Sequence, residues 1–347
     1  MTVMANDPLV SICIPTYNAE ATFESTLASI LAQTYRKLRI VIVDNASVDG
    51  TLEIARRFDD PRIEVHSNTT NVGAEGNFNR CIQLASGKYA AIYHADDLYE
   101  PDIVAREVEF LETHPEAGAV FTGAWMIDNH GAVIKKYLLP SRFRSQEPGR
   151  CFDFRAIFSG ILRYSNFVLT PSVMVRTDIY QNEICRWRGD LFGSSADLDV
   201  WLRILRPHQF GICSAPLMRY RVSAQQGSQH LIRQRLAKAD LLRVLERYVA
   251  EQEEADALTS EDRFYYSCLQ RTDRVVRAMN HLMLGNPSEA VNLTGDVSSR
   301  ESLAAAFSGI RGLQTLLLGA FVRASAAWGM GSPARRVLKW SRKKLWK

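Results

Sequence analysis

The stretch Tyr89-Ala90-Ala91-Ile92-Tyr93-His94-Ala95-Asp96-Asp97 contains the features that decide the fold of this chain. An apolar run leads into two adjacent carboxylates, and Pro101 follows four residues later. A strand of an open α/β sheet that ends in this way holds its carboxylates at the edge where such folds bind ligands. Adjacent carboxylates repel each other unless a cation or a donor lies between them, and a hard divalent cation holding a diphosphate supplies that charge. The alternative is an acidic loop that caps a helix beginning near Pro101.

Length and composition are those of an ordinary globular chain. The 347 residues are 46% hydrophobic and 23% charged, which allows one large domain with an appendage or two modest domains. No stretch of about 18 apolar residues occurs, so we expect no membrane-spanning helix. The N-terminus lacks the pattern of a secretory signal, which predicts a cytoplasmic protein. The six cysteines show no CxxC pairing, and several lie within apolar runs, which indicates reduced core cysteines rather than metal ligands or disulfides.

Positive charge is concentrated at the C-terminus. Residues 331–347 contain seven Lys and Arg and no acid, so the net charge of +4 less these seven leaves −3 for the other residues. Trp340 and Trp346 lie among the basic residues, a pattern typical of a segment that binds an anionic lipid surface. The acidic body offers no wider basic footprint, so we do not expect nucleic acid as a partner.

Strand and helix signals alternate through the first half of the chain. Apolar, β-branched runs predict strands at 9–15, 38–43, 63–66, 88–94 and 119–126, and helical spacing predicts helices at 19–33, 51–58, 74–85 and 101–113. This alternation predicts an α/β fold in which helices flank a mostly parallel central sheet, with a Rossmann-like, nucleotide-binding half. Weaker signals predict strands at 133–138 and 172–176, a polar loop at 140–149, a helix at 196–205 and an extended segment at 210–222.

Strand signals end near residue 229. Helical spacing then predicts helices at 231–249, 262–284 and 301–328. We therefore expect two domains, residues 1–225 and a helical region at 226–347 that ends in the basic tail. The helices would serve as a packing appendage, as a surface for a homo-oligomer, or as a dock on the inner leaflet of a membrane.

Three of the predicted strands end in polar residues: Pro15-Thr16-Tyr17-Asn18, Asp44-Asn45, and Asp96-Asp97. Because the carboxyl ends of parallel strands share one edge of a sheet, these groups should converge. Asp44 can accept hydrogen bonds from the N–H edge of a nucleobase, and Tyr17 offers the base an aromatic face. The structural alternatives are a turn-forming Asp44, an ordinary surface Tyr17 and an Asn18 that caps the next helix.

Two further segments carry candidate groups. Gly73 in Asn71-Val72-Gly73 would let the backbone approach a ligand closely, or would simply form a turn before a helix. Asp197 and Asp199 lie near the start of the predicted helix 196–205, where the helix dipole favours negative charge. One of these carboxylates could instead be the general base that transfer to a hydroxyl acceptor requires.

In their order and spacing these pieces resemble a family 2 glycosyltransferase with the GT-A fold. The matching segments are 10–18, 43–51, 71–73, 85–89, 95–97 with Pro101, and 197–203. The resemblance implies a metal-dependent enzyme of the hexosyl- or deoxyhexosyltransferase class that builds a cell-envelope polysaccharide. It would move a sugar, with inversion, from a nucleoside-diphosphate sugar to a hydroxyl of a glycan or lipid-linked acceptor. The place of work would be the cytoplasm, peripheral at the inner face of the membrane.

The resemblance also implies roles for single residues. Asp197 would be the catalytic base, and Asp97 would ligate a Mn²⁺ or Mg²⁺ that bridges the diphosphate. Asp96 would lie on the ribose side, Asp44 would recognise the base, and Arg221 could hold phosphate. The nucleotide sugar would also contact the residues Pro15, Thr16, Tyr17, Asn18 and Asn71.

Two positions depart from the family pattern. His94 stands where the metal motif usually opens with Asp, and a neutral imidazole brings no negative charge. Ala196 stands where a Glu usually precedes the base. The alternative function is therefore a non-catalytic binding or scaffold subunit of the same fold in a glycan-assembly system. An unrelated nucleotide enzyme is disfavoured, because no GxGxxG follows the first strand and no GxxxxGK occurs.

Overall fold

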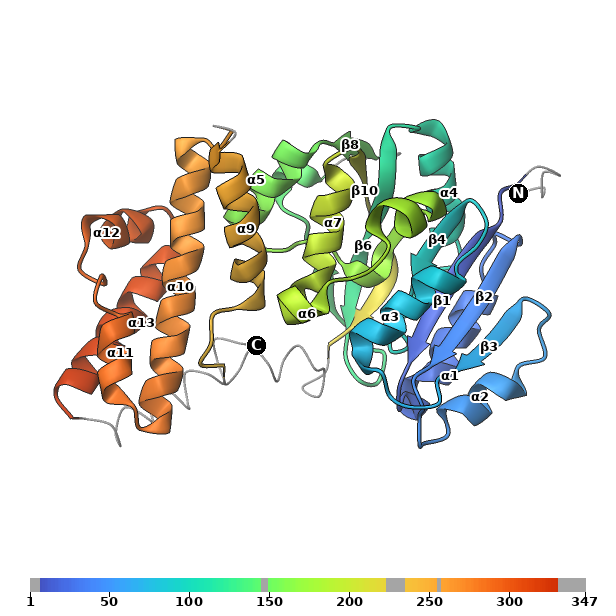
Figure 1. Cartoon of the computed structure of the whole chain (residues 1–347), viewed down its shortest axis with the longest axis horizontal. Helices are drawn as coiled ribbons and strands as arrows, with labels where there is room; N and C mark the ends of the chain where they lie inside the picture. The colour runs from blue at the N-terminus through green and yellow to red at the C-terminus, as the bar shows by residue number, and fades with distance from the viewer. Residues whose placement is uncertain (1–6, 145–148, 223–234, 255–256, 330–347) are drawn as a thin grey trace. The chain divides into compact units, whose positions relative to one another are not determined.

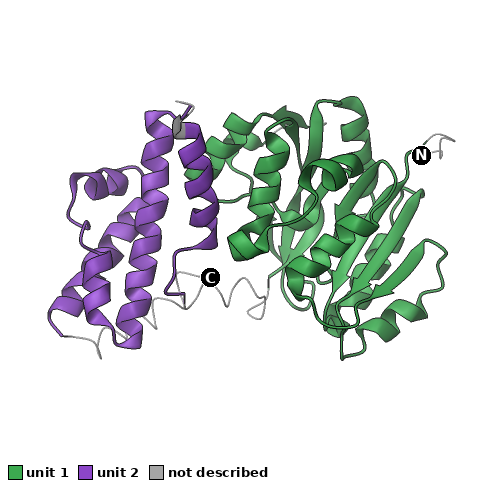
Figure 2. Ribbon diagram, viewed as in Figure 1, with its two compact units in different colours: residues 1–223 green, residues 224–347 purple. Residues whose placement is uncertain are grey.

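The computed structural model describes residues 7–144, 149–222, 235–254 and 257–329 (Figure 1). The chain divides into two compact units, residues 1–223 and 224–347 (Figure 2). The first is an α/β unit, and the second is helical where it is described. The predicted domain boundary at residue 225 falls in the segment 223–234, outside the described residues.

The first unit is built on one ten-stranded sheet of order β3-β2-β1-β4-β9-β6-β10-β5, with β7 beside β6 and β8 beside β10. The strands are β1 (Val10–Thr16), β2 (Leu38–Asp44), β3 (Ile63–Ser67), β4 (Tyr89–Ile92), β5 (Leu98–Tyr99), β6 (Ala117–Ile127), β7 (Val133–Tyr137), β8 (Arg150–Phe152), β9 (Val173–Arg176) and β10 (Gln209–Arg221). Strands β1, β2, β3, β4, β6 and β10 run in one direction, and the others run against them. The prediction of a mostly parallel sheet is confirmed, and β9 makes it a mixed one.

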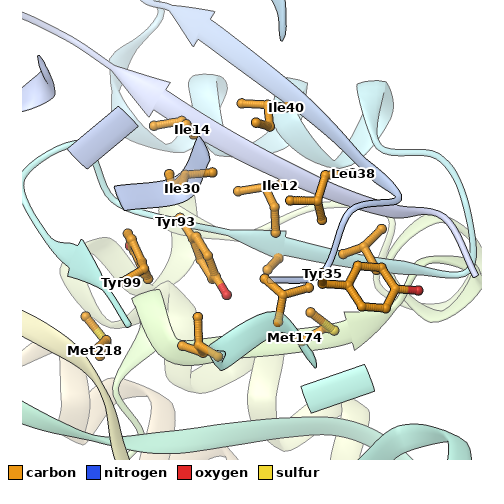
Figure 3. Packing of buried hydrophobic residues seen from close by; sticks show 14 of the residues in the cluster. Ile12, Ile14, Ile30, Tyr35, Leu38, Ile40, Tyr93, Tyr99, Met174 and Met218 are labelled. Carbon is orange, nitrogen blue, oxygen red and sulfur yellow. The ribbon is translucent and has the colours of Figure 1, made fainter. Parts of the chain in front are cut away.

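Helices cover the sheet and separate its strands along the chain. They are α1 (Glu20–Leu31), α2 (Thr51–Arg57), α3 (Gly73–Leu84), α4 (Ile103–Thr113), α5 (Phe154–Tyr164), α6 (Gly189–Phe192) and α7 (Ala196–Leu205). Alternate residues of β1 face opposite layers, as the two-residue period of a strand requires. Ile12 and Ile14 pack in one core with Ile30 of α1 (Figure 3). Cys13 faces the other layer, where its Sγ lies 3.5 Å from the carbonyl of Cys81 in α3.

The middle of the first unit holds elements that the sequence pattern did not predict. These are α5 and a π-helical turn, Ile179–Ile184. Gly160 interrupts the apolar spacing of α5, but it is there for packing, because a Cβ at this position would lie 2.5 Å from the ring of Phe143. The predicted polar loop 140–149 is not wholly polar in its contacts, since Phe143 is buried and stacks on Phe167.

The second unit contains α9 (Asp240–Glu254), α10 (Ser260–Leu284), α11 (Pro287–Leu293), α12 (Arg300–Phe307) and α13 (Ile310–Ala327). A capping box of Thr259 and Asp262 begins α10, and Gly285 in the left-handed conformation ends it. The prediction of one helix over 301–328 is wrong, because the extended backbone of Gly309 separates α12 from α13. The first residues of the predicted helix 231–249 lie outside the described part, and the described helix begins at Asp240.

Among the described residues, no helix combines the length and the apolar character needed to cross a membrane.

Candidate active site

Strands β1 and β2 bring their last residues to one edge of the sheet. Thr16 pairs with Asp44, and its Oγ1 donates to Asp44 Oδ1 at 3.3 Å; Pro15, one residue earlier, pairs with Val43. Asp44 is 1% exposed, and its other oxygen accepts from the Ser47 N–H at 3.1 Å. Asp44 therefore does organise a turn, as the structural alternative supposed. Since each carboxylate oxygen has two lone pairs, it also retains acceptor capacity towards a base.

The loop after β1 is tied to the loop after β2. Asn18 adopts a left-handed conformation with φ 48°, and its Oδ1 accepts from the Val48 N–H at 3.0 Å. Its own N–H donates to Ser47 Oγ at 3.0 Å. The alternative that Asn18 caps the next helix is wrong, because Ala19 holds the N-cap position of α1. Tyr17, between these anchors, is 51% exposed, so its ring is accessible to a flat ligand.

Asn45 connects this edge to the segment before α3. Its Nδ2 donates to Asn71 Oδ1 at 2.8 Å and to the Gly73 carbonyl at 3.1 Å. Its Oδ1 accepts from Asn68 Nδ2 and from the Val72 N–H, both at 2.9 Å. One amide thus holds Asn71 beside the end of β2. The sequence marked Asn45 only by its place after Asp44.

His94, Asp96 and Asp97 follow β4 and form a cluster of candidate metal ligands, in which one ligand atom from each lies within 4.8 Å of the others. Asp97 is fully buried, and its Oδ1 accepts from the Arg221 backbone N–H at 2.7 Å. Its Oδ2 has no hydrogen-bond partner among the described residues. Burial, followed by the charge of Asp96, raises the pKa of Asp97 well above its usual range. A divalent cation would satisfy this oxygen, so the donor set fits such an ion.

His94 belongs to this cluster, although the sequence analysis named only Asp97 as a metal ligand. Its Nε2 is buried and lacks a hydrogen-bond partner in the described part of the chain. Burial lowers the pKa of His94 against the opposing charge of Asp96, which favours the neutral ring that ligates metals. Phe78 packs edge-on against the imidazole with ring centroids 5.7 Å apart. A second cluster within the described residues, at the opposite edge of the sheet where β6 begins, consists of His114, Glu116 and Cys151.

Helix α1 binds the backbone of residues 94–97, the loop that carries these candidate ligands. Thr26 Oγ1 donates to the carbonyls of Ala95 at 3.0 Å and Asp97 at 2.8 Å, and Thr22 Oγ1 donates to Ala95 at 3.0 Å. The alternative, in which the acidic loop caps α4, is wrong, because Asp102 holds the N-cap position of this helix. The loop is instead fixed by the helix that follows the predicted nucleotide-binding loop.

Arg221, at the end of β10, holds the same loop from another direction. Its Nε donates to the Asp96 carbonyl at 2.7 Å, and its Nη1 donates to the carbonyls of Asp128 and Asn129, both at 2.9 Å. The side chain is 6% exposed. These contacts make Arg221 a positioning residue for the loop, and the expected phosphate contact stays a prediction.

The two carboxylates of α7 have different surroundings. Asp199 is fully buried and forms ion pairs with Arg188 and with Arg203, the latter at 3.1 Å. Asp197 accepts from Thr170 Oγ1 at 2.7 Å and from the N–H of the next residue at 2.7 Å. Burial raises the pKa of Asp197, and these hydrogen bonds oppose the rise. Asp199 is therefore structural, and Asp197 is the carboxylate suited to exchange a proton.

The sheet topology brings Asp197 towards the candidate ligands. Strand β9 pairs antiparallel with β4, so Thr170, three residues before β9, lies near the end of β4 that the cluster of His94, Asp96 and Asp97 follows. Thr170 in turn donates to Asp197. Burial raises the pKa of Tyr220, and the charges of Asp97, Asp96 and Asp197 raise it further. Sequence reasoning gave Tyr220 no role and missed Thr170, because Thr170 lies in the least patterned part of the first unit and no motif marks it.

An α/β unit whose strands β1, β2 and β4 lead into polar and acidic residues at one edge of the sheet agrees with the GT-A fold of glycosyltransferases. The model of the Glycosyl transferase family 2 matches residues 11–162. EpsE of Bacillus subtilis (strain 168) is 31% identical over 208 residues, which are 58% of this chain and 68% of that protein. The chain belongs to glycosyl transferase family 2.

Other similar proteins extend the comparison. WfaP of Escherichia coli, a UDP-Glc:alpha-D-GlcNAc-diphosphoundecaprenol beta-1,3-glucosyltransferase, is 33% identical over 140 residues, 37% of this chain and 56% of its own. The structure of S. aureus TarS residues 1–349 in complex with UDP-GlcNAc superposes with a TM-score of 0.62 over 92% of both chains, at 17% identity. The TarS likeness shows the fold.

Proposed function

We propose that this glycosyltransferase moves a sugar, with inversion at the anomeric carbon, from a nucleoside-diphosphate sugar to a hydroxyl of a lipid-linked glycan. The observation that carries the proposal is the buried Oδ2 of Asp97, unpaired among the described residues, within the cluster of His94, Asp96 and Asp97 that follows β4. A scaffold subunit of the same fold would gain nothing from an unpaired buried carboxylate, which costs stability.

A UDP-sugar is the proposed donor. WfaP and WfgD of Escherichia coli are named as UDP-Glc glucosyltransferases, and TarS was solved with UDP-GlcNAc. The spare lone pairs of Asp44 suit the N–H of uracil, and the exposed ring of Tyr17 suits its face. Asn71, fixed by Asn45, completes this side of the donor site.

Mn²⁺ or Mg²⁺ is the proposed cofactor, held by His94, Asp96 and Asp97. The unpaired Oδ2 of Asp97 supports this assignment, because a buried oxygen without a donor requires a positive partner. The bound cation supplies charge that stabilises the departing diphosphate. Thr26 and Arg221 keep the loop in place before the donor arrives, so the ligands need little rearrangement.

Asp197 is the proposed general base. It takes the proton of the acceptor hydroxyl while that oxygen bonds to the anomeric carbon, and the bond from this carbon to the diphosphate breaks, with its electron pair leaving on the diphosphate. Thr170 orients the carboxylate, and its hydrogen bond lowers the pKa of Asp197 against the effect of burial. The hydrogen bond from Thr170 thereby favours the ionised form, which is the form that a general base requires.

The proposed acceptor is a polyprenyl-diphosphate-linked sugar of a cell-envelope polysaccharide. WfaP and WfgD are named for diphosphoundecaprenol acceptors. Such an acceptor lies at a membrane, so we place the protein in the cytoplasm and peripheral at the inner face of that membrane. The basic tail at 331–347 suits anionic lipid but lies outside the described residues. A homo-oligomer through the C-terminal helices stays a prediction.

The test combines donor, acceptor and cation. Purified protein with Mn²⁺, a panel of UDP-sugars and a polyprenyl-diphosphate-linked N-acetylhexosamine should release UDP only when all are present, and NMR of the product should show inversion. Asp197→Asn should abolish transfer. Asp190→Asn, a control at a half-exposed carboxylate, should not. Absence of nucleoside-diphosphate binding in a thermal-shift panel, with and without Mn²⁺, would overturn the proposal.

A further inference from the structure

The side of α13 that faces solvent is mostly apolar, with Arg311 and Gln314 as its exposed polar residues. Its buried residues, Gly319, Val322, Ser325 and Ala326, lie on the side that packs in the second unit. Ile310, Leu313 and Leu317 recur at helical spacing on the other side and are 68%, 41% and 62% exposed. A surface helix of a globular protein normally presents polar residues there. This helix has apolar residues on both sides.

The apolar surface continues at both ends of α13. Phe307, the last residue of α12, is 90% exposed, and Leu303, one turn earlier, is 46% exposed. Trp328, next to the end of α13, is 76% exposed. The two helices cross tightly, since a Cβ at Gly312 would overlap the carbonyl of Ala305. We define the α12–α13 apolar face as Leu303, Phe307, Ile310, Leu313, Leu317 and Trp328.

Charge along this part of the chain has a single sign. No Asp or Glu occurs from Ser302 to the C-terminus, whereas this segment contains Arg311, Arg323 and the seven basic residues of 331–347. Arg323 is used within the unit, where it donates to the carbonyls of Val291 and Thr294. Arg311 is exposed beside Ile310. Apart from Glu301 in the first turn of α12, the helices that carry this apolar face and the segment after them have only positive charges, which is the composition of an interfacial lipid-binding helix.

The positive charge also favours anionic lipid over a second copy of the chain as the partner that covers this face. In a two-fold symmetric dimer this face would meet itself, and the basic residues of both copies would be brought together. Like charges across an interface oppose association. An anionic lipid surface instead attracts basic residues, at about 1 kcal/mol for each one near the head groups.

We infer that the α12–α13 apolar face docks on an anionic phospholipid surface, with α13 lying in the plane of the interface. No described helix is long and apolar enough to span the bilayer, which agrees with a helix that lies on it. The inference uses the proposed function only to explain why a membrane is the place of work. Docking can be measured without any transfer reaction.

The experiment measures flotation of the full chain with vesicles of phosphatidylglycerol and phosphatidylcholine, and with phosphatidylcholine alone. We expect binding to the anionic vesicles that weakens with salt. Leu313→Glu with Leu317→Glu should lower the partition coefficient by roughly 100-fold, since each change replaces an inserted apolar side chain by a charge that the lipid repels. Leu138→Glu, at a 65% exposed residue of the first unit, is the matched control and should bind as the wild type does.

Two outcomes overturn the inference. The first is equal vesicle binding by the double variant and the wild type, or no binding by either. The second is a wild-type dimer that does not bind vesicles and that the double variant converts to monomer, which would make the face an interface between copies. Sugar transfer to a short, water-soluble acceptor separates the two proposals, because it does not require a membrane. The double variant should catalyse this transfer as the wild type does. If neither protein catalyses it, the proposed function is contradicted and the docking inference is not.

Discussion

Replacing Asp97 with asparagine should stabilise the cation-free protein while abolishing cation binding. Asp97 is fully buried, and only one of its oxygens is hydrogen-bonded within the described residues. The neighbouring Asp96 adds repulsion, as the raised pKa of Asp97 reflects. Asn keeps the shape and the acceptor for the Arg221 N–H but removes the charge. The charge of Asp97 therefore lowers the stability of the cation-free protein, whereas the proposed cation binding requires this charge.

The size of the effect follows from the unpaired oxygen. Leaving a buried polar group unpaired costs about 1–3 kcal/mol, and more when the group is charged. Because the new amide NH₂ is also unpaired, we expect a net gain of about 1–2 kcal/mol in the free energy of unfolding. For a unit of this size that corresponds to a rise of roughly 2–8 °C in Tm.

The pH dependence has a defined sign. The pKa of Asp97 is raised in the folded state, so the folded protein binds this proton more tightly than the unfolded chain does. Below the unfolded pKa the carboxyl is neutral in both states and costs nothing. As pH rises through the folded pKa, the wild type loses stability that the asparagine variant retains. The difference in Tm should therefore shrink in acid.

The assay is urea or thermal unfolding in EDTA and in Mn²⁺. At 100-fold excess over its Kd, Mn²⁺ should stabilise the wild type by about 2.7 kcal/mol and leave the variant unchanged. Asp199→Asn is the matched control, because it makes the same change at a carboxylate paired with Arg188 and Arg203. It should destabilise the protein by about 3 kcal/mol. A lower Tm of Asp97→Asn in EDTA, or a Tm that Mn²⁺ still raises, would refute the reasoning.

Substitutions at four further positions test the rest of the site. Asp197→Asn should lower kcat by about 10³-fold or more while UDP affinity in calorimetry stays the same, and retained turnover would exclude this base. Thr170→Val removes a hydrogen bond that lowers the pKa of Asp197, so the acid limb of the kcat–pH profile should move to higher pH, and Thr170→Ser should restore it. His94→Asp should raise the affinity for Mg²⁺ relative to Mn²⁺ in cation titrations, because carboxylate oxygen is the harder ligand, and an unchanged ratio would place His94 outside the cation site. Asn45→Ala breaks four hydrogen bonds and should weaken UDP binding about tenfold, whereas unaltered UDP affinity would make its network purely structural.

Sequence periodicity predicted the fold well where each element has one apolar pattern. Strand β2 is an example: Ile40, Val41, Ile42 and Val43 are all fully buried, as a continuous apolar run in a parallel sheet should be. Two of the errors fall at glycines. Gly160 lies inside α5 because an aromatic ring packs on it. Gly309 separates two helices through its backbone conformation, although the helical apolar spacing is found on both sides of it.

The strand pattern predicted the candidate residues that lie at strand ends, but it did not predict the groups from distant segments that contact them. A carboxylate that follows a buried strand must lie at the sheet edge, so Asp44 and Asp97 could be found from the strands alone. The groups that set their chemical state come from distant segments. Asp97 accepts a hydrogen bond from a backbone N–H 124 residues away, and Thr170 precedes Asp197, to which it donates, by 27 residues. No local pattern encodes such contacts.

The departure at His94 is compatible with catalysis when charge is considered together with geometry. The carboxylates of Asp96 and Asp97, one negative charge each, would balance the charge of a bound divalent cation. A third carboxylate at position 94 would leave an excess negative charge facing the diphosphate, and at these short distances the repulsion would be substantial. A neutral imidazole offers a ligand without that charge. The substitution thus removes a negative charge from the ligand set and leaves its carboxylates intact, which argues for an active transferase and against a scaffold that has lost its metal site.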